Sequence, residues 1–306
     1  MLVPSWLAAY LNDMDESLVG SGYADHLTDA DLALLASVAG TGMDTAGAAA
    51  ARLRRDPAAL PELISDARVF EAVFGDRAGT QRRPVIASPF LAFAVAVHRA
   101  AAELASMIHV PELSAPRRRV PLFDASELRD FLASPARKLF LAEFLASFTR
   151  IASGQYRDRT GRRPRARLFS ELDPVRLAAL LDETGEAERA GVFRRLGDVA
   201  LFLTGVFPDY AASQALGPVS AARLLDAARL PSGQNGRLAG APPIELLEHL
   251  GAGWYRAAWV LAPVRTARLA VVAEVSDRFR QARRVLNHVA DRYLFPPGSP
   301  WFPPPV

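Results

Sequence analysis

The stretch that most constrains the fold is Leu196 to Tyr210, the most continuously apolar run in the second half of the chain. Its apolar residues recur with helical spacing and form a stripe that is wide enough to need several neighbouring helices. Gly197 and Gly205 interrupt this stripe. Each glycine costs about 1 kcal/mol relative to alanine in a helix interior, so we expect another helix to approach closely there. The run predicts the central buried helix of an all-helical fold.

Signals for the start of a helix recur along the rest of the chain. They combine a capping residue with a proline, or with an acid three positions later, as at Thr28, Ser88, Ser134 and Asp173. The best strand candidate is the segment 119–123, and its proline argues against a strand. The predicted core helices are 89–108, 135–152, 186–207, 243–261 and 264–293. We therefore predict an all-α protein, an irregular multi-helix bundle of about nine to eleven helices.

The length of 306 residues allows one large domain. We expect a single helical domain over residues 1–294. Its first part, residues 1–51, holds seven acids and neither lysine nor arginine, and we expect it to pack on the rest as helices. The proline-rich residues 295–306 predict an extended, polyproline-like tail.

Composition limits the chemistry and the location that we expect. The chain has no cysteine, which excludes disulfides, thiolate metal sites and a cysteine nucleophile, and fits a reducing compartment. The N-terminus lacks the pattern of a signal peptide. The longest apolar stretch, Pro84 to Val97, is shorter than the roughly 20 residues that span a bilayer. We expect a soluble, cytoplasmic protein without a transmembrane segment.

The densest charge lies in the segment 157–167, which we expect to be a loop. It holds one acid and six arginines, namely Arg157, Arg159, Arg162, Arg163, Arg165 and Arg167. Guanidinium groups bind phosphate or carboxylate through paired hydrogen bonds, so the loop can hold nucleic acid, an anionic surface or an acidic partner. A solvated basic loop is the simpler interpretation, because Tyr156 and Phe169 only flank it and no helix-turn-helix signature accompanies it.

Four polar residues of the predicted helices are candidates for a catalytic or ligand-binding pocket. His98 lies in a very apolar segment, where a histidine either packs with a hydrogen bond or acts as a ligand or base. Asp198 either pairs with Arg194, one turn earlier, or faces a pocket. Glu245 and His249 lie one turn apart, a spacing that can chelate a metal, although a surface pair is the simpler interpretation. We predict no metal and no cofactor.

The tail supplies the candidate partner-binding residues, Trp301 and Phe302, which lie between prolines. The chain has no phosphate-binding loop, nucleophile elbow or zinc-protease motif. We therefore expect an interaction or scaffold protein without catalytic activity, with a protein partner or self-association. The first alternative is a helical enzyme or small-ligand-binding protein with an interhelical pocket. The second is binding of nucleic acid or an anionic surface through the segment 157–167.

Overall fold

The structure is a computed structural model. It describes residues 16–40, 45–75, 87–115, 118–149, 153–158, 165–170, 172–182, 184–213, 218–227, 238 and 240–295. These residues form fifteen α-helices and two two-stranded sheets, which confirms the predicted all-α, multi-helix fold. The helices are more numerous than the nine to eleven expected, because several predicted segments divide into shorter helices. Apart from Phe295, the predicted tail lies outside the described residues.

The chain divides into two compact units, and each unit is assembled from separate segments. Unit 1 comprises Met1–Val110, Leu122–Thr149 and His288–Val306, and unit 2 comprises Pro111–Pro121 and Arg150–Asn287. The single domain expected for residues 1–294 stays a prediction.

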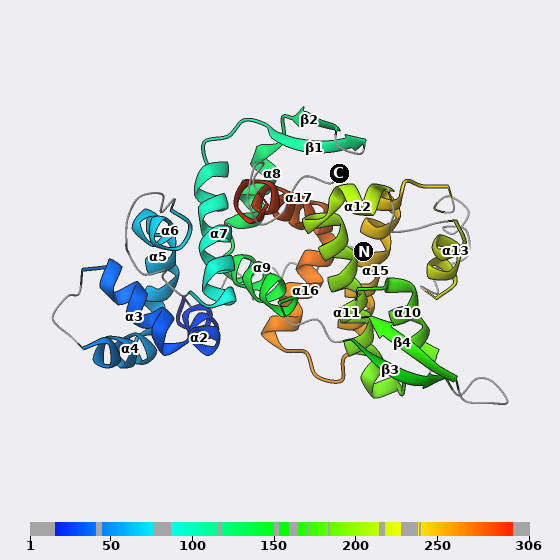
Figure 1. Cartoon of the computed structure of the whole chain (residues 1–306), viewed down its shortest axis with the longest axis horizontal. Helices are drawn as coiled ribbons and strands as arrows, with labels where there is room; N and C mark the ends of the chain where they lie inside the picture. The colour runs from blue at the N-terminus through cyan, green and yellow to red at the C-terminus, as the bar shows by residue number, and fades with distance from the viewer. Residues whose placement is uncertain are drawn as a thin grey trace. The chain divides into compact units, whose positions relative to one another are not determined.

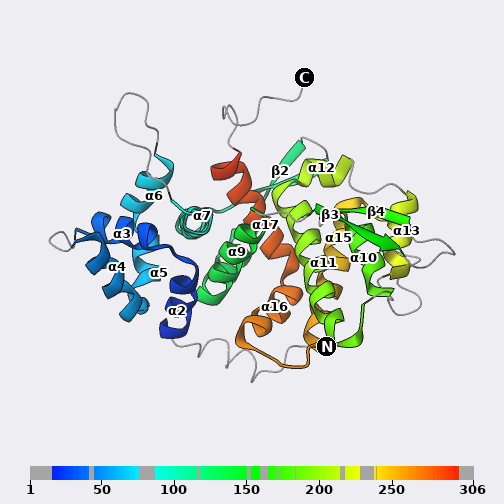
Figure 2. The ribbon, with the colours of Figure 1, turned by 60° about the horizontal axis from the view of Figure 1, so that its bottom comes forward.

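Unit 1 contains the helices of the first half of the chain (Figure 1). They are α2 (Glu16–His26), α3 (Asp29–Val38), α4 (Ala46–Arg55), η1 (Pro57–Ala59), α5 (Leu60–Ser65), α6 (Ala67–Phe74), α7 (Pro89–Leu104), α8 (Ala125–Leu132) and α9 (Pro135–Ser147). The last residues of α17 and the π-helical turn η3 (Ala290–Leu294) also belong to it. The core lies where α7 packs on α9, and Figure 2 shows α7 end-on beside α9.

The helix starts predicted at Thr28, Ser88 and Ser134 are confirmed at the level of single hydrogen bonds. The Thr28 side chain accepts from the backbone of Asp31, and the Asp31 carboxylate accepts from the backbone of Thr28, which closes a capping box. The Ser88 side chain caps α7, and the Ser134 side chain caps α9, each followed by a proline at the first helical position. Such caps satisfy backbone N–H groups that have no partner inside the helix.

Unit 2 contains both sheets, apart from Val110 and Leu122, and the apolar run Leu196 to Tyr210. Its elements are β1 (Val110–Ala115), β2 (Arg118–Leu122), β3 (Ser153–Asp158), β4 (Arg165–Ser170), α10 (Pro174–Ala179), η2 (Leu180–Asp182), α11 (Glu186–Val206), α12 (Pro208–Ser213), α13 (Pro218–Ala227), α15 (Pro243–Leu261), α16 (Ala267–Asp277) and α17 (Phe279–Val289). Helix α11 packs along α15, and α16 packs on α15 (Figure 1). The core of unit 2 lies between these helices.

The glycines of α11 have the close neighbours that the sequence predicts. A Cβ atom added to Gly197 would lie 2.3 Å from Cδ1 of Tyr255 on α15. A Cβ atom added to Gly205 would lie 2.9 Å from Cβ of Leu286 on α17. Both distances are shorter than a carbon–carbon contact allows, so only glycine lets these helices approach as they do.

The prediction of one continuous helix over 264–293 is wrong. The helix is interrupted at Arg278, where φ is −121° and ψ is 31°, and α16 and α17 lie on either side of this residue. Helix α16 begins at a cap, because the Thr266 side chain accepts a hydrogen bond from the backbone N–H of Leu269. The break leaves the apolar spacing intact, since Val275, Phe279 and Ala282 are all buried.

The expectation that the segment 119–123 is not a strand is also wrong. Most of it belongs to β2, which pairs with β1. A two-stranded sheet has only edge strands. On an edge strand the nitrogen of a proline can face away from the partner strand, so its lack of an N–H costs no hydrogen bond between the strands. Pro121 therefore does not prevent the pairing.

None of the helices in the described part of the chain is long and apolar enough to cross a membrane.

Candidate functional site

His98 is buried in unit 1, on α7, and both of its ring nitrogens have partners. The hydroxyl of Tyr23, on α2, lies 2.8 Å from Nε2, and Oγ of Ser65, at the end of α5, lies 2.6 Å from Nδ1. Ser65 also donates its proton to the carbonyl oxygen of Pro61 at 2.7 Å. A hydroxyl has one proton, so Ser65 accepts from Nδ1–H and Tyr23 donates to Nε2. His98 is therefore a neutral imidazole with both hydrogen bonds made.

The environment of His98 keeps the imidazole neutral. Burial, together with the positive charge of Lys138, lowers the pKa of His98 to about 3. A general base works best when its pKa lies near the operating pH, so this histidine is a weak base for proton abstraction at neutral pH. The geometry favours a packing role over a catalytic one.

Asp198 is buried in unit 2, on α11, and it combines the two interpretations made from the sequence. Its Oδ1 accepts from Nε of Arg194 at 2.9 Å and from the hydroxyl of Tyr255, on α15, at 2.7 Å. Burial and the negative charge of Asp198 raise the pKa of Tyr255 well above its usual value, so this hydroxyl keeps its proton. The carboxylate faces inward, and there it joins α11 to α15.

Glu245 and His249 lie near the start of α15 and are both exposed. The structure does not bring them together with Asp198, which is buried against Tyr255 further along α15. Among the described residues, no group of three or more histidines and acids could hold a metal ion.

The arginine-rich segment is only partly a loop, which corrects the expectation. Arg157 lies in β3, opposite Ala166 in β4, and Asp158 lies opposite Arg165. Arg167 pairs in register with Tyr156. Arg159, Arg162 and Arg163 lie outside the described residues, as do Trp301 and Phe302 of the tail. The alternation of arginine with other residues from Arg165 onward is the signal for a strand.

Unit 2 contains a buried cluster of charges that the sequence analysis did not find. Arg283 and Arg284, on α17, each have side chains that are only 2% exposed. Arg283 donates to Oε1 of Glu112, on β1, at 2.5 Å, and it also forms an ion pair with Glu248 of α15. Nε of Arg284 lies 2.6 Å from Oε2 of Glu112. Two guanidinium groups thus face two carboxylates.

Asn287 extends this cluster to the end of α11. Its Oδ1 accepts from Arg283 at 2.8 Å, and its Nδ2 donates to the carbonyl oxygens of Thr204 at 2.9 Å and Gly205 at 2.7 Å. The last carbonyls of a helix have no partner inside it, so Asn287 satisfies groups that would otherwise be buried without one. The cluster therefore links α17, α15, β1 and α11.

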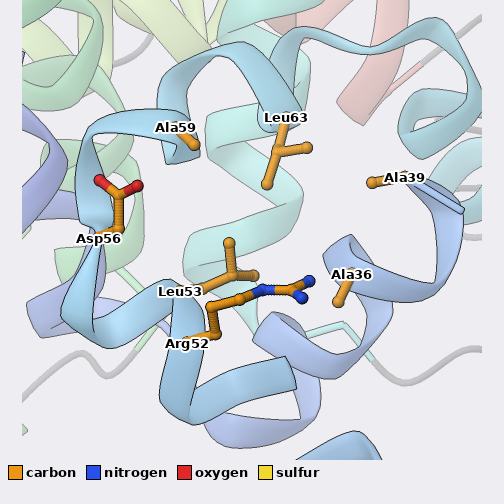
Figure 3. A pocket seen from close by; sticks show the side chains of 7 residues that line it. All are labelled: Ala36, Ala39, Arg52, Leu53, Asp56, Ala59 and Leu63. Atoms are coloured by element: carbon orange, nitrogen blue, oxygen red, sulfur yellow. The ribbon is translucent and has the colours of Figure 1, made fainter. Parts of the chain in front are cut away.

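Unit 1 has a cavity of about 260 Å³ between α3, α4, η1 and α5 (Figure 3). Leu53 and Leu63 point into it from opposite sides, and the guanidinium of Arg52 reaches across it toward Ala36. The residues that line it are Ala36, Ala39, Arg52, Leu53, Asp56, Ala59 and Leu63. The four polar candidates from the sequence do not line this cavity.

Large apolar side chains are exposed at the end of α15 and just beyond it. Val260 is 61% exposed, Leu261 47% and Val264 70%. The guanidinium carbon of Arg265 lies 4.9 Å from the centre of the Trp259 ring. We call residues 259–265 the α15 end surface.

Comparison with known proteins gives no relative from which a role can be transferred. No protein-family model, no curated protein and no solved structure matches the chain. The fold and the site geometry define an all-α protein whose buried polar candidates, His98 and Asp198, bind partners inside the chain.

Proposed function

We propose that this is an interaction protein that associates with a second copy of itself through the α15 end surface. The observation that carries the proposal is the exposure of Val260, Leu261 and Val264 within five residues of the sequence. Single exposed apolar residues are normal, but adjacent ones that form a patch mark contact sites. Full burial of a valine or leucine side chain contributes about 1.5–3 kcal/mol, so three of them can support a contact.

Two arginines beside this surface have partners within the chain, so their charges do not oppose an apolar contact with a second copy. Arg256 pairs with Asp277 at 2.8 Å, and Arg265 lies over the ring of Trp259. Both guanidinium groups therefore interact within their own chain. Two identical surfaces can meet around a two-fold axis, where apolar residues of one copy face those of the other.

Sedimentation velocity over a series of protein concentrations tests this proposal. The wild-type chain should show a dimer whose fraction rises with concentration. The double variant Val260→Asp, Val264→Asp should remain monomeric, because each dimer would bury four unpaired carboxylates. The control is Ile108→Asp, which places one carboxylate on a residue of unit 1 that is 75% exposed. A wild-type chain that is monomeric at every concentration would refute the proposal, as would equal behaviour of the two variants.

Anion binding through the segment 157–167 is the second candidate function. The observation in its favour is the hairpin register, which puts Arg157, Arg165 and Arg167 in the last three residue pairs before the connecting segment. Binding of this kind weakens steeply with salt, with a slope of about −0.9 in log–log form per DNA phosphate neutralised. Salt-independent binding of DNA would exclude it.

Small-ligand binding, a scaffold role without catalysis and a cytoplasmic location stay predictions. The cavity between α3, α4 and α5 is the place where a ligand search should begin.

A further inference from the structure

Ion pairs join the β1–β2 hairpin to helices of unit 2. None of residues 111–114 and 118–122 is buried. Glu112 forms ion pairs with Arg283 and Arg284, and Arg119 lies 3.4 Å from Asp209 of α12. A segment with so few buried apolar contacts opens more easily than the core around it.

The geometry at Glu112 is that of a bound carboxylate. Each oxygen faces a different guanidinium group, with Oε1 2.5 Å from Arg283 and Oε2 2.6 Å from Arg284. The contact from Arg283 is a charge-assisted hydrogen bond, which is a strong kind of hydrogen bond in proteins. The contact from Arg284 is an ion pair without the geometry of a hydrogen bond. Without Glu112, Arg283 would keep its ion pair with Glu248, and Arg284 would lose the ion pair with Oε2. Removing one partner of a buried ion pair is strongly unfavourable.

We propose that Arg283 and Arg284 form a carboxylate-binding site, which the chain fills with Glu112 of the hairpin and which a small carboxylate anion can fill in its place. The hairpin then acts as a strap that Glu112 helps to hold in place. The site needs a ligand with two oxygens on one carbon, because the two guanidinium groups address the two oxygens separately. This inference does not depend on the association through the α15 end surface.

Rescue of the variant Glu112→Ala by acetate is the test. The change removes the carboxylate and leaves both arginines in place. The melting temperature of the full chain is measured in sodium acetate and in sodium chloride at equal ionic strength. Acetate should raise the melting temperature of this variant by at least about 2 °C relative to chloride, since a ligand that binds only the folded state stabilises it.

Two controls show whether the effect belongs to this site. The wild-type chain should melt at the same temperature in both salts, because Glu112 already fills the site. The variant Glu245→Ala removes an exposed carboxylate from the same unit and should also show no difference. If Glu112→Ala melts alike in acetate and in chloride, the site does not accept a free carboxylate and the proposal fails.

If Glu112→Ala does not fold, a second variant tests whether Glu112 holds the hairpin. Glu112→Gln keeps the shape of the side chain and removes its charge. Amide hydrogen exchange of residues 110–122 should then be at least about tenfold faster than in the wild-type chain, because hydrogen bonds between charged groups are stronger than those that an amide can make. Exchange in α11 and α15 should change much less. Equal exchange of the hairpin in the two chains would show that Glu112 does not hold it.

Discussion

Two glycines of α11 differ in how closely they are packed, and they provide a matched pair of sites for substitution. Gly197 lies against the ring of Tyr255, whereas a Cβ atom added to Gly191 would meet nothing within 4 Å. The ring cannot easily give way, because its hydroxyl is hydrogen-bonded to Asp198 at 2.7 Å.

Gly197→Ala should lower the free energy of unfolding by about 1–3 kcal/mol, the usual effect of overpacking a core. Gly191→Ala should raise it by about 0.5–1 kcal/mol, because alanine loses less conformational freedom in a helix. Urea unfolding of the two variants checks both values. Equal effects would show that Gly197 has no close neighbour.

The lowered pKa of His98 makes the stability of the folded chain depend on pH. Its pKa is lowered from 6.5 to about 3 in the folded chain, so below pH 6.5 the unfolded chain binds a proton that the folded chain does not. The stabilisation is therefore complete above pH 6.5 and falls by about 1.4 kcal/mol per pH unit between 6.5 and 3.

Urea unfolding at a series of pH values checks this dependence. The wild-type chain is compared with His98→Gln, because other groups titrate in the same range and cancel in the difference. The difference in stability between the two chains should shrink as the pH falls from 6.5. A difference that does not change with pH would mean that folding does not lower the pKa of His98.

Single residues also differ in how well the sequence predicts their surroundings. The close approach at Gly197 could be predicted, because a glycine inside an apolar helical stripe has a local signature. The burial of Arg283 and Arg284 could not, since their partner Glu112 is 171 positions from Arg283 in the chain. The local sequence around a buried arginine does not distinguish it from a surface arginine.

Among the features of helices and strands, the sequence predicts the starts of helices best. Asp31 shows why: Oδ2 accepts from the backbone N–H of Thr28 at 2.9 Å, inside the same capping box. Its Oδ1 also accepts from the backbone N–H of Ser88 at 2.8 Å, a long-range contact that ties the start of α3 to the start of α7. The first of these bonds follows from local sequence, and the second does not.

Asp31→Asn should therefore lower the free energy of unfolding by about 1–3 kcal/mol, because an amide nitrogen would face a backbone donor at one of the two positions. The control is Asp29→Asn. The Asp29 side chain is 79% exposed and pairs with Arg54, and such a pair contributes about 0–1 kcal/mol. Thermal or urea unfolding of the two variants separates the effects. Similar losses would show that Asp31 acts only as a surface cap.

Strands and helix breaks were harder to predict than helix starts. The strands β1 to β4 depend on pairing with another segment, and none of them is a long run of alternating apolar residues. The break at Arg278 interrupts an apolar pattern that continues unchanged through it, so periodicity alone could not reveal it. Both errors arise because local patterns do not report tertiary contacts.

At the scale of the whole molecule, composition and helical spacing were enough to predict the fold class. The assembly of each compact unit from separate segments could not be predicted, because no composition change marks the crossings at residues 110, 122, 149 and 287. The proposed self-association belongs to this scale, since it concerns a surface that the chain leaves exposed.

The absence of cysteine makes a direct test of that association possible. A single cysteine introduced by Val260→Cys or Val264→Cys is the only thiol of the chain. Residues near a two-fold axis lie close to their own copies, and a disulfide needs two Cα atoms within about 7 Å. We expect at least one of these variants to form disulfide-linked dimers much faster than Ile108→Cys, whose position is 75% exposed on unit 1. Crosslinking of both variants at the rate of the Ile108→Cys control would contradict it.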